Sequence, residues 1–396
     1  MAGTYREFDI IIVGGGIVGG ALAYTLSKGP WQIALVDAVE KKIEDARLIA
    51  LNAGSCCLFK NSGLWPALAA DATSIQQIHV SHQGHFGITR IAAQELGVDT
   101  LGHVVPANAI VKSIFAALSN RENVKIICPA LLTAITPDTE TSTLAFDTAA
   151  GKEIYQADII IGADGSYSTV RELLGIQTQT IDYQQSALVT VTELARHHNH
   201  VAYERFQKEG AIAMLPLADN RVATIWTSSN THINHLMQLT PSDFLQQLQQ
   251  QFGYRLGRML QIGKRATYPL QMQQVQQQLK QNVLLIGNAA HTLHPIAAQG
   301  LNIALYEVAA LTDYLLKQSS LKKCLMNLPL DSLQQSFSRR LSHGLTELFA
   351  KDLFPVNLAR QAGMISFDQC TPLKKKFASH TMGKAGHVPS LFLNME

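Results

Sequence analysis

Short runs of apolar residues, separated by turns rich in small residues, open the chain. Phe8–Val13 and Ile33–Val36 are two such runs, and a segment with alanine and leucine, Ile17–Leu26, lies between them. Continuous apolar runs of this length are typical of strands that are buried on both faces of a parallel sheet. The segment between them is long enough for a helix that packs on that sheet. The pattern therefore predicts a βαβ unit at the start of the chain.

The pattern up to Gly165 predicts more of this sheet and a small meander. Asp45–Leu51 is predicted as a loop, Ser55–Leu64 as a helix, and Ala107–Leu118 has helical spacing. Three short strands are predicted to form the meander: Val124–Ile127, Leu144–Asp147 and Ile154–Gln156. A further buried strand, Ile159–Ile161, ends at the turn Gly162-Ala163-Asp164-Gly165.

The composition then becomes rich in β-forming residues. Strands with alternating or aromatic character are predicted at Leu188–Leu194, Val201–Phe206, Ala211–Leu217 and Val222–Thr227. Together with Ile75–Arg90, which begins with the strand Ile75–Ser81, they predict a separate antiparallel sheet that is covered on one side. Helices are predicted at Pro241–Gln251, in the glutamine-rich stretch Gln271–Gln278, and over most of the chain after Asn302.

Length and composition indicate a globular enzyme of two to three domains. The chain has 396 residues, of which 47% are hydrophobic and 16% charged, and its net charge of +2 gives no reason to expect nucleic-acid binding. The five cysteines are an odd number without CxxC spacing, so we expect reduced thiols in a cytoplasmic protein. The uncharged run Ile10–Ser27 contains too many glycines for a membrane span, and no signal peptide is predicted.

A glycine-rich turn follows the first predicted strand. Gly14, Gly16 and Gly19 have the spacing of the dinucleotide fingerprint, and they lie between a strand and a helix, as that motif requires. The glycines allow a tight turn, a close approach of the backbone to a pyrophosphate, and close packing of helix on strand. Asp37 stands 18 residues after Gly19, where an acid binds ribose hydroxyls. This motif alone does not distinguish NAD from FAD.

Two later segments also join a buried strand to small residues. Ala157–Arg171 contains Asp164 and Gly165 directly after its strand. Val283–Asn302 runs from a strand through Gly287, turns at Pro295 and opens a helix near Gly300. Small residues at such a junction let the backbone approach a flat, phosphate-bearing ligand.

With these three motifs the chain resembles the class A FAD-dependent aromatic monooxygenases. Within them it is most similar to the ubiquinone-biosynthesis hydroxylase family, in particular its 2-polyprenyl-6-methoxyphenol hydroxylases. The resemblance covers nearly the whole chain and includes the stretches Val80–His85, Tyr203–Phe206 and Ala213–Leu217. It implies an α/β fold with three parts. These are a Rossmann-like FAD-binding domain, of the glutathione-reductase-like βαβ type with a β-meander, an antiparallel-sheet substrate domain, and a helical C-terminal region.

The resemblance also implies the domain boundaries. The FAD-binding domain is expected to be discontinuous, with residues 1–74, 100–180 and 275–325. The substrate domain is expected at 75–99 and 181–274, and the helical region at 326–396.

The resemblance further implies which residues bind the cofactor. Asp164 and Gly165 match a motif that holds the FAD pyrophosphate and the reductant, and Arg47 matches an arginine near the flavin. The set expected to bind FAD is Gly14, Gly16, Gly19, Asp37, Arg47, Asp164, Gly165, Gly287, Asn288, Gly300 and Asn302. Pro295, Gln299, Gly300 and Asn302 are expected to surround the reactive end of the flavin. The chain departs from the family at Asn288, which replaces an aspartate on the ribityl chain, at Ala298, which replaces a glycine, and at Asp37, which replaces a glutamate.

The reaction implied is ring hydroxylation of a polyprenylated phenol. NAD(P)H visits transiently and reduces FAD, O2 adds to the flavin, and the C(4a)-hydroperoxide transfers one oxygen to the ring. The flavin carries this chemistry, so no catalytic acid or base is assigned, and an apolar tunnel is expected between the FAD domain and the antiparallel sheet. Two alternatives stay open: a FAD-dependent prenyl reductase or other non-oxygenating flavoprotein, and a non-catalytic subunit of a quinone-biosynthesis assembly.

The remaining chemical groups suggest fewer roles. The pairs His82/His85 and His291/His294 lack an obvious carboxylate or cysteine partner, so no metal site is predicted. His197, His198 and His200 are predicted in a surface loop. The basic turn Leu373–Phe377 and the amphipathic stretch Leu345–Phe354 suggest contact with a quinone-biosynthesis complex or with the inner face of a membrane.

Overall fold

The first sheet of the computed structural model carries the parallel strands that the opening pattern predicts. The structure describes residues 6–39, 47–292, 299–330 and 354–393. The parallel strands are β1 (Arg6–Val13), β2 (Ile33–Val36), β8 (Val124–Ile127), β11 (Gly151–Gly162) and β19 (Val283–Leu285), in the order β19-β11-β1-β2-β8. The short strand β18 (Leu279–Lys280) pairs antiparallel with β19 at one edge.

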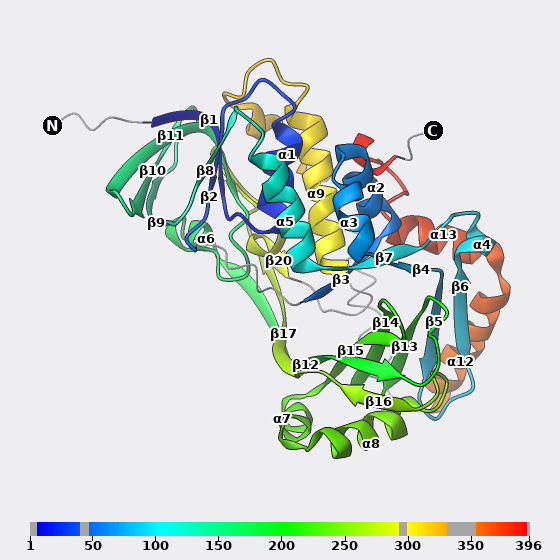
Figure 1. The fold of residues 1–396 in the computed structure, drawn as a ribbon. Coiled ribbons are helices and arrows are strands. Elements are labelled where there is room, and N and C mark those ends of the chain that lie inside the picture. Colours follow the sequence, from blue (N-terminus) through cyan, green and yellow to red (C-terminus); the bar gives the residue numbers. More distant parts are fainter. Residues whose placement is uncertain (1–5, 40–46, 293–298, 331–353, 394–396) are drawn as a thin grey trace.

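Three helices cover one face of this sheet. They are α1 (Ile17–Leu26), α5 (Ala107–Leu118) and α9 (Gln299–Leu315), and Figure 1 shows them side by side. Successive residues of a strand point to opposite faces, so Ile10 and Ile12 pack against the helices while Ile11 packs on the other face. All three isoleucines are fully buried, which explains why the sequence of β1 is apolar without alternation.

The meander differs from its predicted form. Ile154–Gln156 and Ile159–Ile161 belong to one strand, β11, whose first half pairs with β10 (Ser142–Thr148), which in turn pairs with β9 (Ala130–Thr136). Val124–Ile127 is not part of the meander, because it pairs parallel with β2. The apolar pattern shows that a segment is a strand, but its partner depends on residues far away in the chain.

The second sheet is the predicted separate layer, which lies below the first part in Figure 1. Its strand pairs are antiparallel as predicted, except that Gln77–His82 runs parallel to Val201–Gln207. Its order is β20-β17-β12-β15-β14-β13-β5-β6, and β16 pairs with β12. The strands are β5 (Gln77–His82), β6 (Ile88–Ala92), β12 (Thr178–Leu194), β13 (Val201–Gln207), β14 (Gly210–Pro216), β15 (Arg221–Ser229), β16 (Met259–Ile262), β17 (Ala266–Val275) and β20 (His291–Thr292). One face packs on α7 (Asn230–Gln238) and α8 (Pro241–Phe252) through Trp226, Phe244 and Leu248.

The glutamine-rich stretch is a strand and not the predicted helix. Gln271–Val275 is the second half of β17, which pairs antiparallel with β12 over its whole length. Leu270 and Val275 are its buried positions. Glutamine is a good helix former, but pairing with a long neighbouring strand overrides a weak local preference.

A small third sheet lies between the other two. Its order is β3-β7-β4, with β3 (Leu48–Asn52), β4 (Thr73–Ile75) and β7 (Gly102–Pro106). The predicted loop over Asp45–Leu51 is therefore wrong for Leu48–Leu51, and residues 45–46 lie outside the described part. The nearby helices are α2 (Ala53–Ser62), α3 (Trp65–Leu68) and α4 (Ala93–Leu96), and α6 (Thr169–Leu173) follows β11.

The C-terminal segment packs against β6 and α4. It consists of α12 (Phe354–Gln369) and α13 (Thr371–Thr381), and most of the predicted amphipathic stretch Leu345–Phe354 lies outside the described residues. Leu373–Phe377 is helical, so the predicted turn is wrong, whereas Leu373, Lys375 and Lys376 are exposed. Lys374 is buried and bonds the carboxylate of Glu95 at 2.6 Å, which lowers the pKa of Glu95. No helix among the described residues is long and apolar enough to cross a membrane.

Replacing Lys374 with alanine should loosen this packing. Glu95 would lose its buried ammonium partner, and we expect the free energy of unfolding to fall by roughly 1–2 kcal/mol, measured by urea denaturation. Lys375→Ala is the matched control, because its side chain is exposed on the same helix. Equal losses in the two variants would contradict a role of the Lys374–Glu95 pair.

Candidate functional site

The glycine-rich turn between β1 and α1 uses its three glycines in two ways. Gly14 has a φ of +105°, and an added Cβ would lie 2.4 Å from the carbonyl oxygen of Ala163. A Cβ on Gly19 would lie 1.9 Å from the carbonyl oxygen of Gly14. These two glycines are required by the protein's own packing. A Cβ on Gly16 would meet nothing within 4 Å, so Gly16 borders open space at the N-terminus of α1.

Asp37 holds the turn from the end of β2. Its Oδ2 accepts a hydrogen bond from the backbone N–H of Gly15 at 2.7 Å, and its Oδ1 accepts one from Val39 at 3.1 Å. The carboxylate therefore fixes the backbone next to Gly16. Its predicted contact with ribose hydroxyls stays a prediction.

The ends of β11 and β19 bring the other two motifs to the same edge of the sheet. Asp164 lies beside Gly14, because a Cβ on that glycine would lie 2.7 Å from the Asp164 Cα. Asp164 Oδ2 accepts from the Val170 N–H at 3.0 Å, whereas its Oδ1 is buried without a partner among the described residues. Asn288, which is exposed, donates to Ser166 Oγ at 3.4 Å. The structure thus brings together motifs that lie more than a hundred residues apart in the chain.

These features fit a dinucleotide such as FAD. Gly16 leaves space for a pyrophosphate, and Gly165 also has nothing within 4 Å of an added Cβ. The unpartnered Asp164 Oδ1 is an acceptor for which a ligand hydroxyl is a suitable donor. The helix N-terminus after Gly16 favours negative charge.

Arg171 joins two of these motifs, a role that the sequence did not reveal. Its guanidinium donates to the carbonyl oxygens of Ala289 at 2.9 Å and of Ser166 at 2.7 Å. It therefore ties the segment after β11 to the segment after β19. In the sequence, only the position of Arg171 at the end of the motif Ala157–Arg171 indicated a role for it.

Glu307 supports the turn at Gly287 from inside α9. Its Oε2 accepts from the Gly287 N–H at 2.9 Å, and its Oε1 lies 2.7 Å from His291 Nε2. Glu307 and His291 are both buried. His291 thus has a carboxylate partner that the sequence did not reveal, and His294 lies outside the described residues. A single glutamate within the apolar run of α9 was the available signal.

Asn302 connects α9 to β3. Its Oδ1 accepts from the Asn52 N–H and its Nδ2 donates to the Ala50 carbonyl oxygen, both at 2.9 Å. The side chain of Asn52 extends these contacts to α13. Its Nδ2 donates to the Thr381 carbonyl oxygen at 2.8 Å, and its Oδ1 accepts from the Ser55 N–H at 2.8 Å.

The other predicted residues of this region lie around Asn302 or outside the described part. Gln299 is buried, and its Oε1 has no partner among the described residues. Gly300 has open space beside it, and Arg47 stands exposed at the start of β3. Pro295 and Ala298 lie outside the described residues.

A large cavity opens between β3, the second sheet, α12 and α13. Its volume is about 1070 Å³, and Gln299 and Asn302 line one end. The wall is mostly apolar, with members such as Ile78, Ile91, Leu215, Leu270, Phe367 and Phe377. This cavity lies where the apolar tunnel was predicted.

Three charged side chains line this cavity among the described residues. Arg47 stands at one edge, and buried Arg360 lies 3.0 Å from His82 Nδ1 through its Nη2. The third is Glu204 on β13, and burial raises the pKa of its carboxyl to about 7. The sequence indicated no role for Glu204, which belongs to the stretch Tyr203–Phe206 that carries the resemblance.

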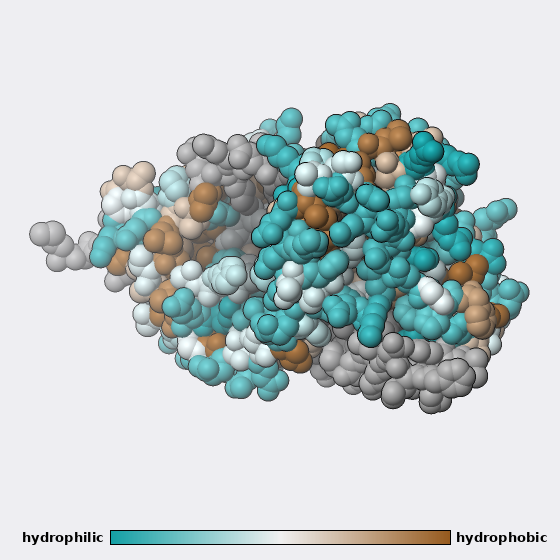
Figure 2. Space-filling model, turned by 90° about the horizontal axis from the view of Figure 1, so that it is seen from below, coloured by the Kyte–Doolittle hydropathy of each residue, from teal (hydrophilic) through white to brown (hydrophobic). Residues whose placement is uncertain are grey.

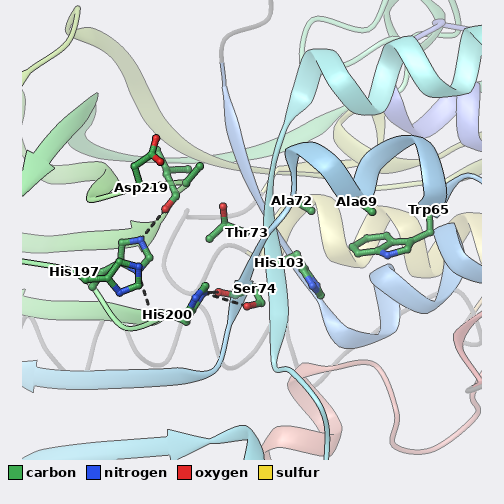
Figure 3. Close-up of a pocket in the computed structure, with 12 residues that line it drawn as sticks. Trp65, Ala69, Ala72, Thr73, Ser74, His103, His197, His200 and Asp219 are labelled. Atoms are coloured by element: carbon green, nitrogen blue, oxygen red, sulfur yellow. Dashed lines mark hydrogen bonds between the residues drawn. The ribbon is translucent and has the colours of Figure 1, made fainter.

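A smaller cavity of about 460 Å³ lies on the seam between α3, β4 and the loops of the second sheet, as Figure 3 shows. The prediction that His197, His198 and His200 form a surface loop is wrong for His198, which is buried and bonds the Leu217 carbonyl oxygen at 2.7 Å. His200 Nδ1 lies 3.2 Å from Ser74 Oγ, so these rings join the loop to β4. Burial lowers the pKa of His103 to about 4. In the described part of the chain no group of His, Cys, Asp or Glu has the arrangement of a metal site.

Known proteins share this sequence and fold. The family model of the FAD binding domain matches residues 7–320. Ubiquinone hydroxylase UbiL of Rhodospirillum rubrum is 30% identical over an alignment that covers 96% of this chain and 91% of that protein. The 3-demethoxyubiquinol 3-hydroxylase of Escherichia coli is 27% identical over 96% of this chain and 100% of its own length.

A solved structure agrees in fold. p-Nitrophenol 4-monooxygenase PnpA of Pseudomonas putida superposes with a TM-score of 0.80 at 16% identity, covering 95% of this chain and 98% of that chain. These matches confirm the predicted fold class, the predicted FAD cofactor and the predicted enzyme class. The chain belongs to the FAD-binding domain family of flavoprotein monooxygenases, in which the ubiquinone hydroxylases are its relatives.

Proposed function

We propose that this enzyme hydroxylates the aromatic ring of a polyprenylated phenol in ubiquinone biosynthesis, with FAD as cofactor and NAD(P)H and O2 as co-substrates. The observation that supports the substrate class most directly is the apolar cavity of about 1070 Å³ beside Gln299 and Asn302. Pockets for drug-sized ligands measure about 300–1,000 Å³, so this cavity has room for a ring and part of a prenyl tail.

The proposed cofactor site follows the three motifs. The pyrophosphate would lie against Gly14, Gly16 and Gly19 at the N-terminus of α1, with Asp37 near the ribose. Asp164 and Gly165 would hold the pyrophosphate from the end of the neighbouring strand β11. Asn288, which follows Gly287 in the turn after β19, would hydrogen-bond the ribityl chain. Arg47, Gly300 and Asn302 would surround the ring, together with Pro295 and Gln299. FAD, once reduced by NAD(P)H, supplies the activation of O2 that the protein cannot supply itself.

The residues of the chain would then bind and orient the phenol and exclude water. An apolar wall favours the tail, and it strengthens each polar contact at the ring because water is absent. In this proposal residues 1–74, 100–180 and 275–325 form the FAD part, 75–99 and 181–274 the substrate part, and 326–396 the helical part.

We also propose that a membrane or a quinone-biosynthesis complex delivers the substrate, since a prenylated phenol dissolves poorly in water. On the face in Figure 2, the coloured hydrophobic residues are scattered among hydrophilic ones.

Turnover with a short-tailed 2-prenylphenol tests this function. Purified protein with FAD, NADPH and O2 should yield a product that is heavier by one oxygen, with NADPH consumption matched to product, as measured by mass spectrometry. A prenyl reductase would consume NADPH without adding oxygen. A colourless protein that takes up no added FAD would favour the non-catalytic subunit and overturn the proposal.

A further inference from the structure

Glu204 is the one acidic side chain that lines the large cavity among the described residues. It lies in the middle of β13, where Val80 on β5 and Ala213 on β14 are its cross-strand partners. Ala202 and Phe206, two residues before and after it, line the same cavity, because alternate residues share one face of a strand. The carboxylate therefore lies on the face of β13 that borders this mostly apolar cavity.

The surroundings of Glu204 do not neutralise its charge. No hydrogen bond or ion pair joins it to another described side chain, and burial alone raises the pKa of its carboxyl to about 7. The other titratable groups on the cavity wall are Arg47 on β3, Arg360 on α12, Tyr203 on β13 and Tyr268 on β17. Arg360 is directed to His82 of β5, at 3.0 Å.

A carboxylate in such a place costs stability unless a ligand uses it. A half-buried charge without a partner is disfavoured, and groups with strongly shifted pKa values gather at functional sites. A structural role for Glu204 would need a hydrogen-bond or ion-pair partner for its carboxylate, and the described part of the chain offers none.

We propose that Glu204 is the general base that accepts the proton of the substrate's phenol hydroxyl. The proposal rests on the proposed function, since it assumes a phenol in this cavity. Loss of that proton places negative charge on the phenol oxygen and, by resonance, on the ring carbons beside and opposite it. Those carbons then form the new bond to oxygen more readily.

The proton and electron balance closes without a further reagent. The hydroxyl proton moves to a carboxylate oxygen of Glu204 as the ring carbon bonds one atom of O2. That ring carbon then loses its own hydrogen as a proton to solvent, and the newly bonded oxygen takes up one proton in exchange. Glu204 returns its proton to the oxygen of the original phenol hydroxyl. The second atom of O2 leaves as water. NAD(P)H supplies the two electrons and one of the hydrogens of that water, and solvent supplies the other hydrogen as a proton.

Glu204→Gln separates proton transfer from shape. The amide keeps the size and a hydrogen bond to the phenol but cannot accept the proton. General bases contribute about 10²–10⁴-fold, so we expect hydroxylation to slow by about 100-fold or more, with NADPH oxidation continuing and little product forming. The dissociation constant for the short-tailed phenol, measured on the oxidised FAD enzyme without NADPH, should change by less than about threefold, which is under 0.7 kcal/mol.

The pH profile gives the second measurement. In the wild type, hydroxylation should rise with pH through about 7 as Glu204 loses its proton, and this rise should be absent in Glu204→Gln. Infrared difference spectra of the phenol-free enzyme should show a carboxylic acid band that titrates over the same range and disappears in that variant. Glu204→Asp, which keeps the carboxylate, should restore part of the rate and the pH dependence.

Glu193→Gln is the matched control, because Glu193 lies exposed on β12 of the same sheet. It should leave rate, coupling and pH profile unchanged. If Glu204→Gln hydroxylates at the wild-type rate and pH profile, or only binds phenol more weakly, Glu204 is not the base. If the wild type itself adds no oxygen to any phenol, the proposed function has failed, and the infrared titration still reports whether Glu204 ionises near neutral pH.

Discussion

Gly16→Val should give a folded protein that does not retain FAD. Gly16 has a φ of −65° and a ψ of −172°, which valine can adopt, and an added Cβ meets no atom of the protein within 4 Å. The branched side chain would occupy the space proposed for the pyrophosphate. We expect FAD binding to weaken by roughly 100-fold or more, which corresponds to about 2.8 kcal/mol, measured by flavin absorbance after gel filtration.

Gly19→Ala provides the contrast within the same turn. Its Cβ would lie 1.9 Å from the Gly14 carbonyl oxygen, so the helix would have to move away from the strand. We expect this variant to lose roughly 3 kcal/mol or more of stability and to melt earlier, whereas Gly16→Val should melt close to the FAD-free wild type. A Gly16→Val protein that binds FAD normally would show that the cofactor lies elsewhere.

Glu307→Ala should destabilise the protein more than any exposed substitution on α9. It would leave the Gly287 N–H and the ring of His291 without their acceptor inside a buried region, and it would open a small cavity. We expect the free energy of unfolding to fall by roughly 3–5 kcal/mol in urea denaturation. FAD affinity should fall as well, because the turn that carries Asn288 loses its support.

Two variants separate the causes of that loss. Glu307→Gln keeps an oxygen for Gly287 and should cost only about 1 kcal/mol. Asp313→Ala, on the same helix, removes a partly exposed contact with Ser390 and should also cost about 1 kcal/mol. If all three variants lose equal stability, the buried contacts of Glu307 have no special weight.

The elements predicted best are those in which local pattern and final environment agree. Strand β1 and helix α5 were predicted closely, because apolar runs and helical spacing there match burial in the final fold. The meeting of the three motifs was also predictable, since the carboxyl ends of adjacent parallel strands share one edge of a sheet.

The errors arise where partners far away in the chain decide the outcome. Gln271–Val275 is a strand because β12 pairs with it, and Lys374 is buried because Glu95 faces it across nearly 280 residues. Glu307 and Glu204 escaped prediction for the same reason. Nothing local marks a glutamate as the support of a distant turn or as an acid on the wall of an apolar cavity.

Asn302 and Asn52 link the proposed flavin site to the wall of the cavity. Their hydrogen bonds run from the start of α9 through β3 to the last turn of α13. A bound cofactor that orders the start of α9 therefore also orders the strand and helix that enclose the phenol. Such coupling is reciprocal by thermodynamic necessity, so a phenol that binds more tightly to the FAD-loaded protein must raise the affinity for FAD by the same factor. Substrate supply would then help to decide how much of the enzyme carries its cofactor.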